Sequence, residues 1–254
     1  MTGFKTLLFK ELREQFKTFR LLIVGGVFLF FGLSTPLMIR YLPEIIKLAG
    51  GENAVPIELP PPTALQALAE YSATALQIGL LIAVLVTMGA IAGERKSGTA
   101  LMTLSKPVSA GAFVTSKLIA ISATFAFGLA LGGLGAFGYT WLLFEDGNLG
   151  GFIAQTGLLA VYMTFCVAVT LVFSAVFRNS LAAGGVAIGA LIAGTALTAV
   201  PYLGRVLPGA ITSWGNHLTA GEAGGEEWLA LGVTVALIAA SGWLATGILK
   251  QKEI

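Results

Sequence analysis

The chain has 254 residues, of which 56% are hydrophobic and 11% are charged, with a formal net charge of +2. Fifteen basic and thirteen acidic residues are too few to cover a soluble domain of this length, so the composition excludes that class and indicates long apolar runs. The single cysteine rules out an intrachain disulfide, and with the single histidine it gives no metal-site spacing, so no metal site is predicted.

Residues 2–20 are predicted to form an amphipathic helix. It has an apolar residue at every fourth position and charged residues over much of the remaining surface: the apolar ones are Phe4, Leu8, Leu12 and Phe16, and the charged ones include Lys10, Arg13, Glu14 and Lys17. A basic helix with an apolar stripe is typical of the membrane interface, where its lysines lie near anionic headgroups. The alternative is a solvated helix that leads into the first span. A cleaved signal peptide is not supported, because no small-x-small site follows the apolar run.

Six windows of at least 19 residues contain no Asp, Glu, Lys or Arg. A helix of about 20 apolar residues crosses the hydrocarbon core of a bilayer, and period-2 alternation typical of a membrane barrel is missing. The sequence therefore predicts an all-α polytopic membrane protein with one transmembrane domain over residues 1–254. Its six spans are predicted at about 21–39, 73–93, 118–141, 152–176, 181–200 and 228–249.

Two segments on the predicted outer side have further signals. Thr63 follows a run of three prolines and is predicted to cap a helix that continues to Gly93 and projects beyond the bilayer. Residues 202–227 contain proline, tryptophan and several glycines at moderate apolarity, which favours a re-entrant or interfacial piece.

The basic residues are distributed very unevenly over the predicted loops. Twelve lie on the side of the termini, namely Lys5, Lys10, Arg13, Lys17, Arg20, Arg95, Lys96, Lys106, Lys117, Arg178, Lys250 and Lys252. Only Arg40, Lys47 and Arg205 lie on the other side. Because cytoplasmic loops carry the excess of Lys and Arg, both termini and the loop 94–117 are predicted to be cytoplasmic.

Pairs of glycines four residues apart occur in two predicted spans, Gly128 with Gly132 and Gly185 with Gly189. Small residues at this spacing let two helix backbones approach closely. Both packing within the chain and a seam between two chains remain open from the sequence.

Chemistry of other kinds is poorly supported. Gly93 and Gly98 have the spacing of a phosphate-binding loop, but Thr99 follows directly and the required lysine is missing. His217 has no orienting partner for nucleophilic catalysis, so no enzyme is predicted. The charge-free windows give an ion-coupled carrier few groups to work with, so energy for any active transport is expected to enter from the cytoplasmic face.

The stretch GERKSGTALMTLSKPVSAGAFVTSK, residues 93–117, resembles the first cytoplasmic loop of ABC-2 type transporter permeases. The matching positions are Glu94, Gly98, Thr99, Leu104, Pro107, Ser109 and Lys117, the last being the lysine that enters the third span. FKELREQFK near the start is similar to the interfacial elbow helix of this family, and VFRNSLAAGG at 176–185 to its second cytoplasmic turn. The likeness extends to the permeases of copper-maturation, sodium and antibiotic export systems.

This resemblance implies the permease half of an ATP-driven exporter in the inner or plasma membrane, with two permeases, expected to form a homodimer, and two copies of a cytoplasmic ATPase. The chain would bind no cofactor and no nucleic acid, and the ATPase would use ATP and Mg. The predicted coupling residues are Glu94, Gly98, Thr99, Leu104 and Pro107. Thr99 and Pro107 bound a helix too short to be stable alone, which predicts a partner surface, and Glu94 is expected to bind basic groups there or to cap the turn. The alternatives are a non-transporting scaffold or assembly factor, and a secondary carrier.

Overall fold

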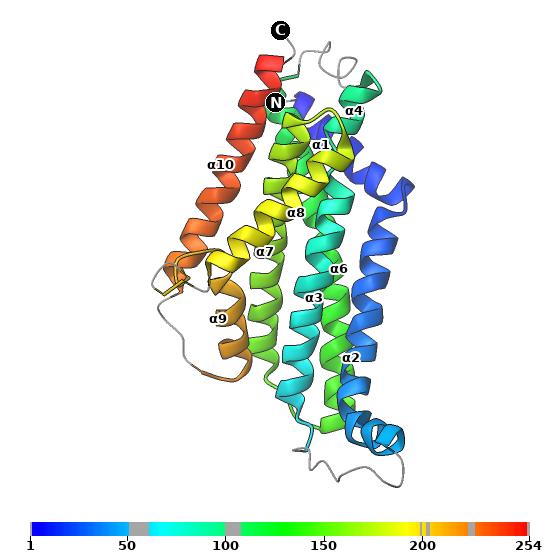
Figure 1. The fold of residues 1–254 in the computed structure, drawn as a ribbon. Helices are drawn as coiled ribbons and strands as arrows, with labels where there is room; N and C mark the ends of the chain where they lie inside the picture. Colours follow the sequence, from blue (N-terminus) through cyan, green and yellow to red (C-terminus); the bar gives the residue numbers. More distant parts are fainter. Residues whose placement is uncertain are drawn as a thin grey trace.

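The structure is a computed structural model that describes residues 2–50, 61–99, 108–198, 200, 201, 204–222 and 227–252. Within these ranges every regular element is helical, as predicted (Figure 1). The helices are α1 (Thr2–Lys17), α2 (Arg20–Gly50), α3 (Ala64–Thr87), α4 (Ala92–Lys96), α6 (Ala110–Phe144), α7 (Leu149–Val176), α8 (Ser180–Leu197), α9 (Ala210–Thr219) and α10 (Trp228–Lys252).

Six helical stretches are long and apolar enough to cross a membrane, and they occur where the sequence predicts the six spans. They are Arg20–Leu48, Ala64–Lys96, Ala110–Phe144, Leu149–Val176, Ser180–Leu197 and Trp228–Gln251. Several continue past the predicted ends. Helix α2 contains Arg40, at which the sequence predicted a loop, and also Pro36 and Pro43. The prediction ended spans at the first charge, whereas a helix can continue once its residues leave the hydrocarbon.

Polar caps fix several helix starts. The hydroxyl of Thr63 accepts a hydrogen bond from the amide of Gln66 at 3.2 Å, which confirms the predicted cap of α3. The helix does not continue to Gly93 as predicted, because α3 ends at Thr87 and α4 follows a turn. Helix α6 begins at Ala110, eight residues before the predicted third span, since the hydroxyl of Ser109 accepts from the amide of Ala112.

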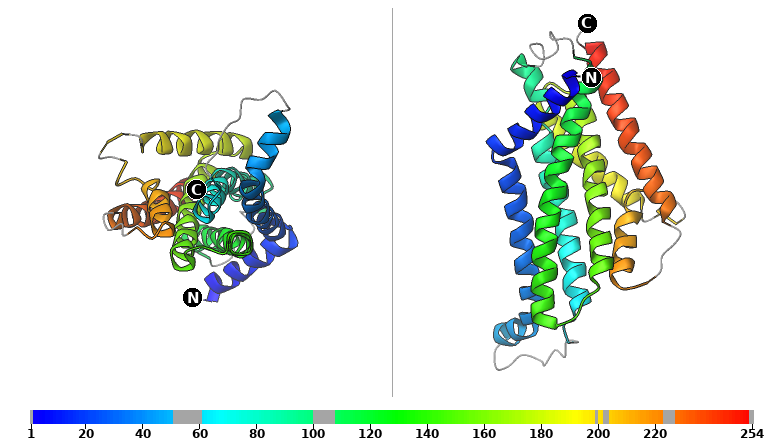
Figure 2. Two further views of the ribbon diagram at one scale, coloured as in Figure 1. Left: turned by 90° about the horizontal axis from the view of Figure 1, so that it is seen from below. Right: turned by 180° about the vertical axis from the view of Figure 1, so that it is seen from behind.

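Helices α6 and α7 form the centre of the bundle. Helix α6 contacts α1, α2, α3, α7 and α10, and α7 also contacts α3, α4, α8, α9 and α10. Helices α8 and α10 lie at the periphery (Figures 1 and 2). Only 22% and 17% of their most apolar windows are buried, against 56% for α7. Most of their apolar surface must therefore be covered by lipid or by another chain.

Glycines allow a close contact between α2 and α6. A Cβ atom on Gly132 would lie 2.5 Å from the carbonyl oxygen of Phe28, and one on Gly32 would overlap the carbonyl oxygen of Gly132. A Cβ on Gly128 would lie 2.9 Å from Cγ1 of Val24. The structure therefore places Gly128 and Gly132 in a contact within the chain.

The other predicted pair has different surroundings. A Cβ atom on either Gly185 or Gly189 would have no described atom within 4 Å, so these glycines leave the outer face of α8 open. In the predicted re-entrant segment, α9 is a helix that packs on α7 (Figure 1). The side-chain amide of Gln155 on α7 donates to the side-chain oxygen of Asn216 on α9, and its oxygen accepts from the hydroxyl of Thr219.

Both termini lie at one end of the bundle, which we call the terminal end (Figure 1). The views in Figure 2 show α1 lying obliquely across this end, outside the long helices. The short helix α4 projects at the same end. The terminal end therefore gathers α1, α4 and the first turns of α6.

Candidate functional site at the terminal end

Helix α1 turns a partly polar stripe toward the bundle. Its buried residues are Leu7, Glu11 and Gln15, four positions apart. The stripe predicted for the membrane interface ends at Phe16, which is 62% exposed, and Phe9 is 73% exposed. The prediction thus missed that α1 has an inward face, and that face includes a carboxylate. Because a buried carboxylate is costly without a cation, its position requires a partner.

That partner is Lys117, on α6. Its Nζ lies 3.0 Å from both carboxylate oxygens of Glu11 and 2.6 Å from Oε1 of Glu94 on α4. The side chains of Lys117, Glu11 and Glu94 are 3%, 3% and 17% exposed. We call these three residues the ionic cluster. It joins α1, α4 and α6, and Lys10 adds a half-exposed cation 3.5 Å from Glu11 and 3.9 Å from Glu94.

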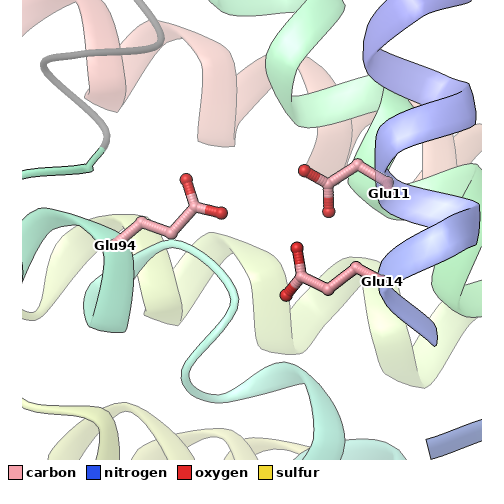
Figure 3. A group of neighbouring side chains, drawn as sticks. All are labelled: Glu11, Glu14 and Glu94. Atoms are coloured by element: carbon pink, nitrogen blue, oxygen red, sulfur yellow. The ribbon is translucent and has the colours of Figure 1, made fainter. Parts of the chain in front are cut away.

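Three carboxylates point toward one another at this site, those of Glu11 and Glu14 from α1 and that of Glu94 from α4 (Figure 3). One oxygen of each lies within 4.8 Å of the others, a spacing that a divalent cation could bridge. Basic side chains already balance these carboxylates, however. Lys117 contacts Glu11 and Glu94, and Arg20 lies 3.9 Å from Glu14. The geometry therefore fits a set of ion pairs between helices better than a metal centre.

A second set of contacts holds α4 against α7. The hydroxyl of Ser174 accepts from the amides of Ile91 and Ala92, both at 3.0 Å, and donates to the carbonyl of Met88 at 2.9 Å. These amides and this carbonyl lie where α3 ends and α4 begins, so they lack partners within a helix. The single hydroxyl of Ser174 therefore supplies hydrogen bonds to all three. The guanidinium of Arg95 donates to the carbonyl of Ala175 at 2.8 Å.

The predicted coupling residues are placed as follows. Glu94 lies in the ionic cluster, and Gly98 has a φ of +76°, a left-handed conformation that favours glycine. The hydroxyl of Thr99 donates to the carbonyl of Glu94 at 3.3 Å. Leu104 and Pro107, with the short helix predicted between Thr99 and Pro107, lie outside the described residues.

Sequence reasoning missed Glu11, Ser174 and the burial of Lys117. The only sequence signal for a special role of Lys117 was its match to the family pattern. The count of loop charges had placed Lys117 in a cytoplasmic loop. For Glu11 the signal was its spacing of four from Leu7 and from Gln15, which puts all three on one helix face.

Comparison with known proteins agrees with this architecture. The sequence model of the family described as ABC-2 family transporter protein matches residues 6–207. The chain is also 30% identical over 214 residues to the uncharacterized transmembrane protein YxlG of Bacillus subtilis (strain 168). This alignment covers 84% of this chain and 83% of that protein. Since the family match spans most of the sequence, including most of α1, all of α4 and the ionic cluster, this multi-pass membrane protein belongs to the ABC-2 family of transporter proteins.

Proposed function

We propose that the chain is the permease subunit of an ATP-driven exporter, energised by a separate cytoplasmic ATPase that uses ATP and Mg. Family membership supports a transport role. The observation that carries the coupling role is the set of contacts that tie α4 to α1, α6 and α7. A displacement of α4 by an ATPase would act on these three helices together, two of which are membrane spans.

The docking surface would be the exposed tip of α4 and the residues after it. Lys96, Ser97 and Thr99 are exposed there. Oε1 of Glu94 is bonded to Lys117, whereas Oε2 has no hydrogen-bond partner among the described residues. Because Oε2 is buried, a basic side chain of the ATPase would reach it only after α4 moves, and it would then complete the shell of this carboxylate, as the sequence predicts for Glu94.

The ATPase contact is tested by replacing Lys96 with glutamate in the permease co-expressed with its ATPase. Lys96→Glu leaves the ionic cluster intact and should reduce both the amount of ATPase that co-purifies and the coupled ATP turnover. Lys250→Glu is the matched control, because Lys250 is an exposed lysine on α10, outside the docking surface. Wild-type binding and turnover in Lys96→Glu, Gly98→Val and Pro107→Ala would mean that this stretch is only a linker.

An ATPase in equal number with the permease would distinguish this function from the two alternatives, a scaffold and a secondary carrier. The ionic cluster does not favour a carrier. Carriers place their coupling-ion sites near the middle of the membrane, whereas this cluster lies at the terminal end beside α1.

We further propose that the terminal end faces the cytoplasm of a cell bounded by the inner or plasma membrane, because the basic residues gather there. Single cysteines at positions 96 and 146, introduced after replacing Cys166, test this orientation with an impermeant thiol reagent on intact cells. We expect labelling at 146 alone. Labelling at 96 alone would invert the topology.

A second permease chain is proposed to pack on the open face of α8. Leu181, Gly185, Gly189 and Ile192 lie on that face and are exposed. Replacing Gly185 and Gly189 together by leucine should weaken the dimer. Gly138→Leu is the control, since a Cβ there also has no described atom within 4 Å but lies on α6. An unchanged dimer in the double variant would mean that this face contacts lipid.

A further inference from the structure

We propose that the outward basic face of α1 binds the headgroup of an anionic phospholipid. The face consists of Thr6, Lys10, Arg13 and Lys17, which we call the basic ridge. Their spacing of four, three and four residues aligns them along one side of the helix. This site is distinct from the proposed ATPase contact at α4.

The basic ridge lines a surface groove of about 560 Å³, together with Phe9, Glu14 and Thr18. This volume is in the range of small-molecule sites, roughly 300–1,000 Å³. The groove has three cationic side chains and one acidic side chain, and Glu14 has Arg20 nearby at 3.9 Å. A net positive charge therefore remains in the groove.

Two of these cations have no ion pair among the described residues, namely Arg13 and Lys17. They are four residues apart on α1, a spacing at which like charges destabilise a helix. Lys10 is three residues from Arg13 and extends the row of positive charge. A phosphate lying between these side chains would replace repulsion with charge-assisted hydrogen bonds.

The surroundings of the ridge favour a lipid as the source of the phosphate. Phe9 lines the groove, and Phe16 and Phe19 follow the ridge closely in the sequence; the three rings are 73%, 62% and 62% exposed. The first span begins at Arg20, directly after the ridge, so Lys17 lies where the chain passes from headgroups into hydrocarbon. A phospholipid fits both the basic ridge and the exposed phenylalanines, because its headgroup would contact the cations and its acyl chains would contact the aromatic rings.

The test measures lipid binding to the full-length purified protein by native mass spectrometry. The probes are a short-chain phosphatidylglycerol, the matching phosphatidylcholine and inorganic phosphate. We expect selective binding of phosphatidylglycerol, and binding about thirty-fold weaker in the double variant Arg13→Gln with Lys17→Gln, from two lost basic contacts. The control is Arg40→Gln with Lys47→Gln, which makes the same charge change at exposed positions of α2 and should bind like the wild type.

Four outcomes would overturn the proposal. Equal binding of the two lipids would show that the negative charge is not recognised. Wild-type binding in the Arg13→Gln and Lys17→Gln variant would place the lipid elsewhere. Competition by inorganic phosphate at the concentration of the lipid would assign the groove to a soluble anion. If the variant instead keeps its lipid and loses the ATPase, the ridge is a protein contact and the lipid assignment is wrong.

Discussion

Replacing Lys117 with methionine should destabilise the protein by removing the cation that joins α1, α4 and α6. Methionine keeps much of the side-chain length, so the change leaves Glu11 and Glu94 as two carboxylates with little solvent, and the half-exposed Lys10 becomes the nearest cation to both. Removing one partner from a buried ion pair costs about 3–5 kcal/mol. For a chain of this size each kcal/mol lowers the unfolding midpoint by about 2–4 °C, which predicts a decrease of about 6–20 °C.

The assay uses the only cysteine of the chain. Cys166 is fully buried on α7, so a fluorogenic maleimide should react with its thiol only as the protein unfolds. Heating purified protein with the reagent gives an apparent midpoint for each variant. Lys5→Met is the matched control, because Lys5 is exposed on α1 and its removal is expected to change stability by less than about 0.5 kcal/mol.

Neutralising the carboxylates provides the rescue. Lys117→Met combined with Glu11→Gln and Glu94→Gln removes the uncompensated charge, so the triple variant should unfold at a higher temperature than Lys117→Met alone. A midpoint for Lys117→Met within one degree of the wild type would refute the reasoning, as would a triple variant that is less stable than the single one.

Three further substitutions can be measured with the same thiol assay. Gly132→Ala should lower the midpoint, because its Cβ would lie 2.5 Å from a carbonyl oxygen of α2, whereas Gly138→Ala on the same helix has space and should gain up to about 1 kcal/mol; the opposite order would contradict the α2–α6 contact. Ser174→Ala should cost about 2 kcal/mol by leaving two amides unpaired, more than Ser72→Ala, whose hydroxyl bonds only a carbonyl of its own helix; equal losses would argue against the role of Ser174. Glu145 ends α6 with a φ of 53°, so Glu145→Gly should be more stable than Glu145→Ala by about 1 kcal/mol, and a less stable glycine variant would exclude the left-handed cap.

The spans could be predicted because crossing hydrocarbon is a local requirement, met within about 20 consecutive residues. The predicted cap at Thr63 is local too, since its hydroxyl bonds an amide three residues ahead; the cap at Ser109 has the same geometry but was not predicted. The ends of α2 and the start of α6 were harder. Arg40 and Lys117 were interpreted as boundaries, and the helices continue through them because one leaves the apolar window and the other finds a buried counter-charge.

The ionic cluster could not be predicted in the same way, because Glu11 and Lys117 are 106 residues apart and their pairing depends on how α1 packs on α6. Identical glycine spacings also have different surroundings, since Gly132 is enclosed by α2 and Gly185 has open space around it. Such differences arise from the positions of neighbouring helices, which the motif itself does not contain.

The separation of the cluster residues along the chain has a consequence for biosynthesis. Glu11 is synthesised 106 residues before Lys117, a delay on the order of ten seconds at usual translation rates. During that interval α1 has no cation from α6 to hold its inward face, so its docking must follow insertion of the third span. Helix α1 leaves the ribosome before the other described helices and yet is among the later ones to reach its final place, and a nascent chain arrested before residue 117 should expose it to proteases.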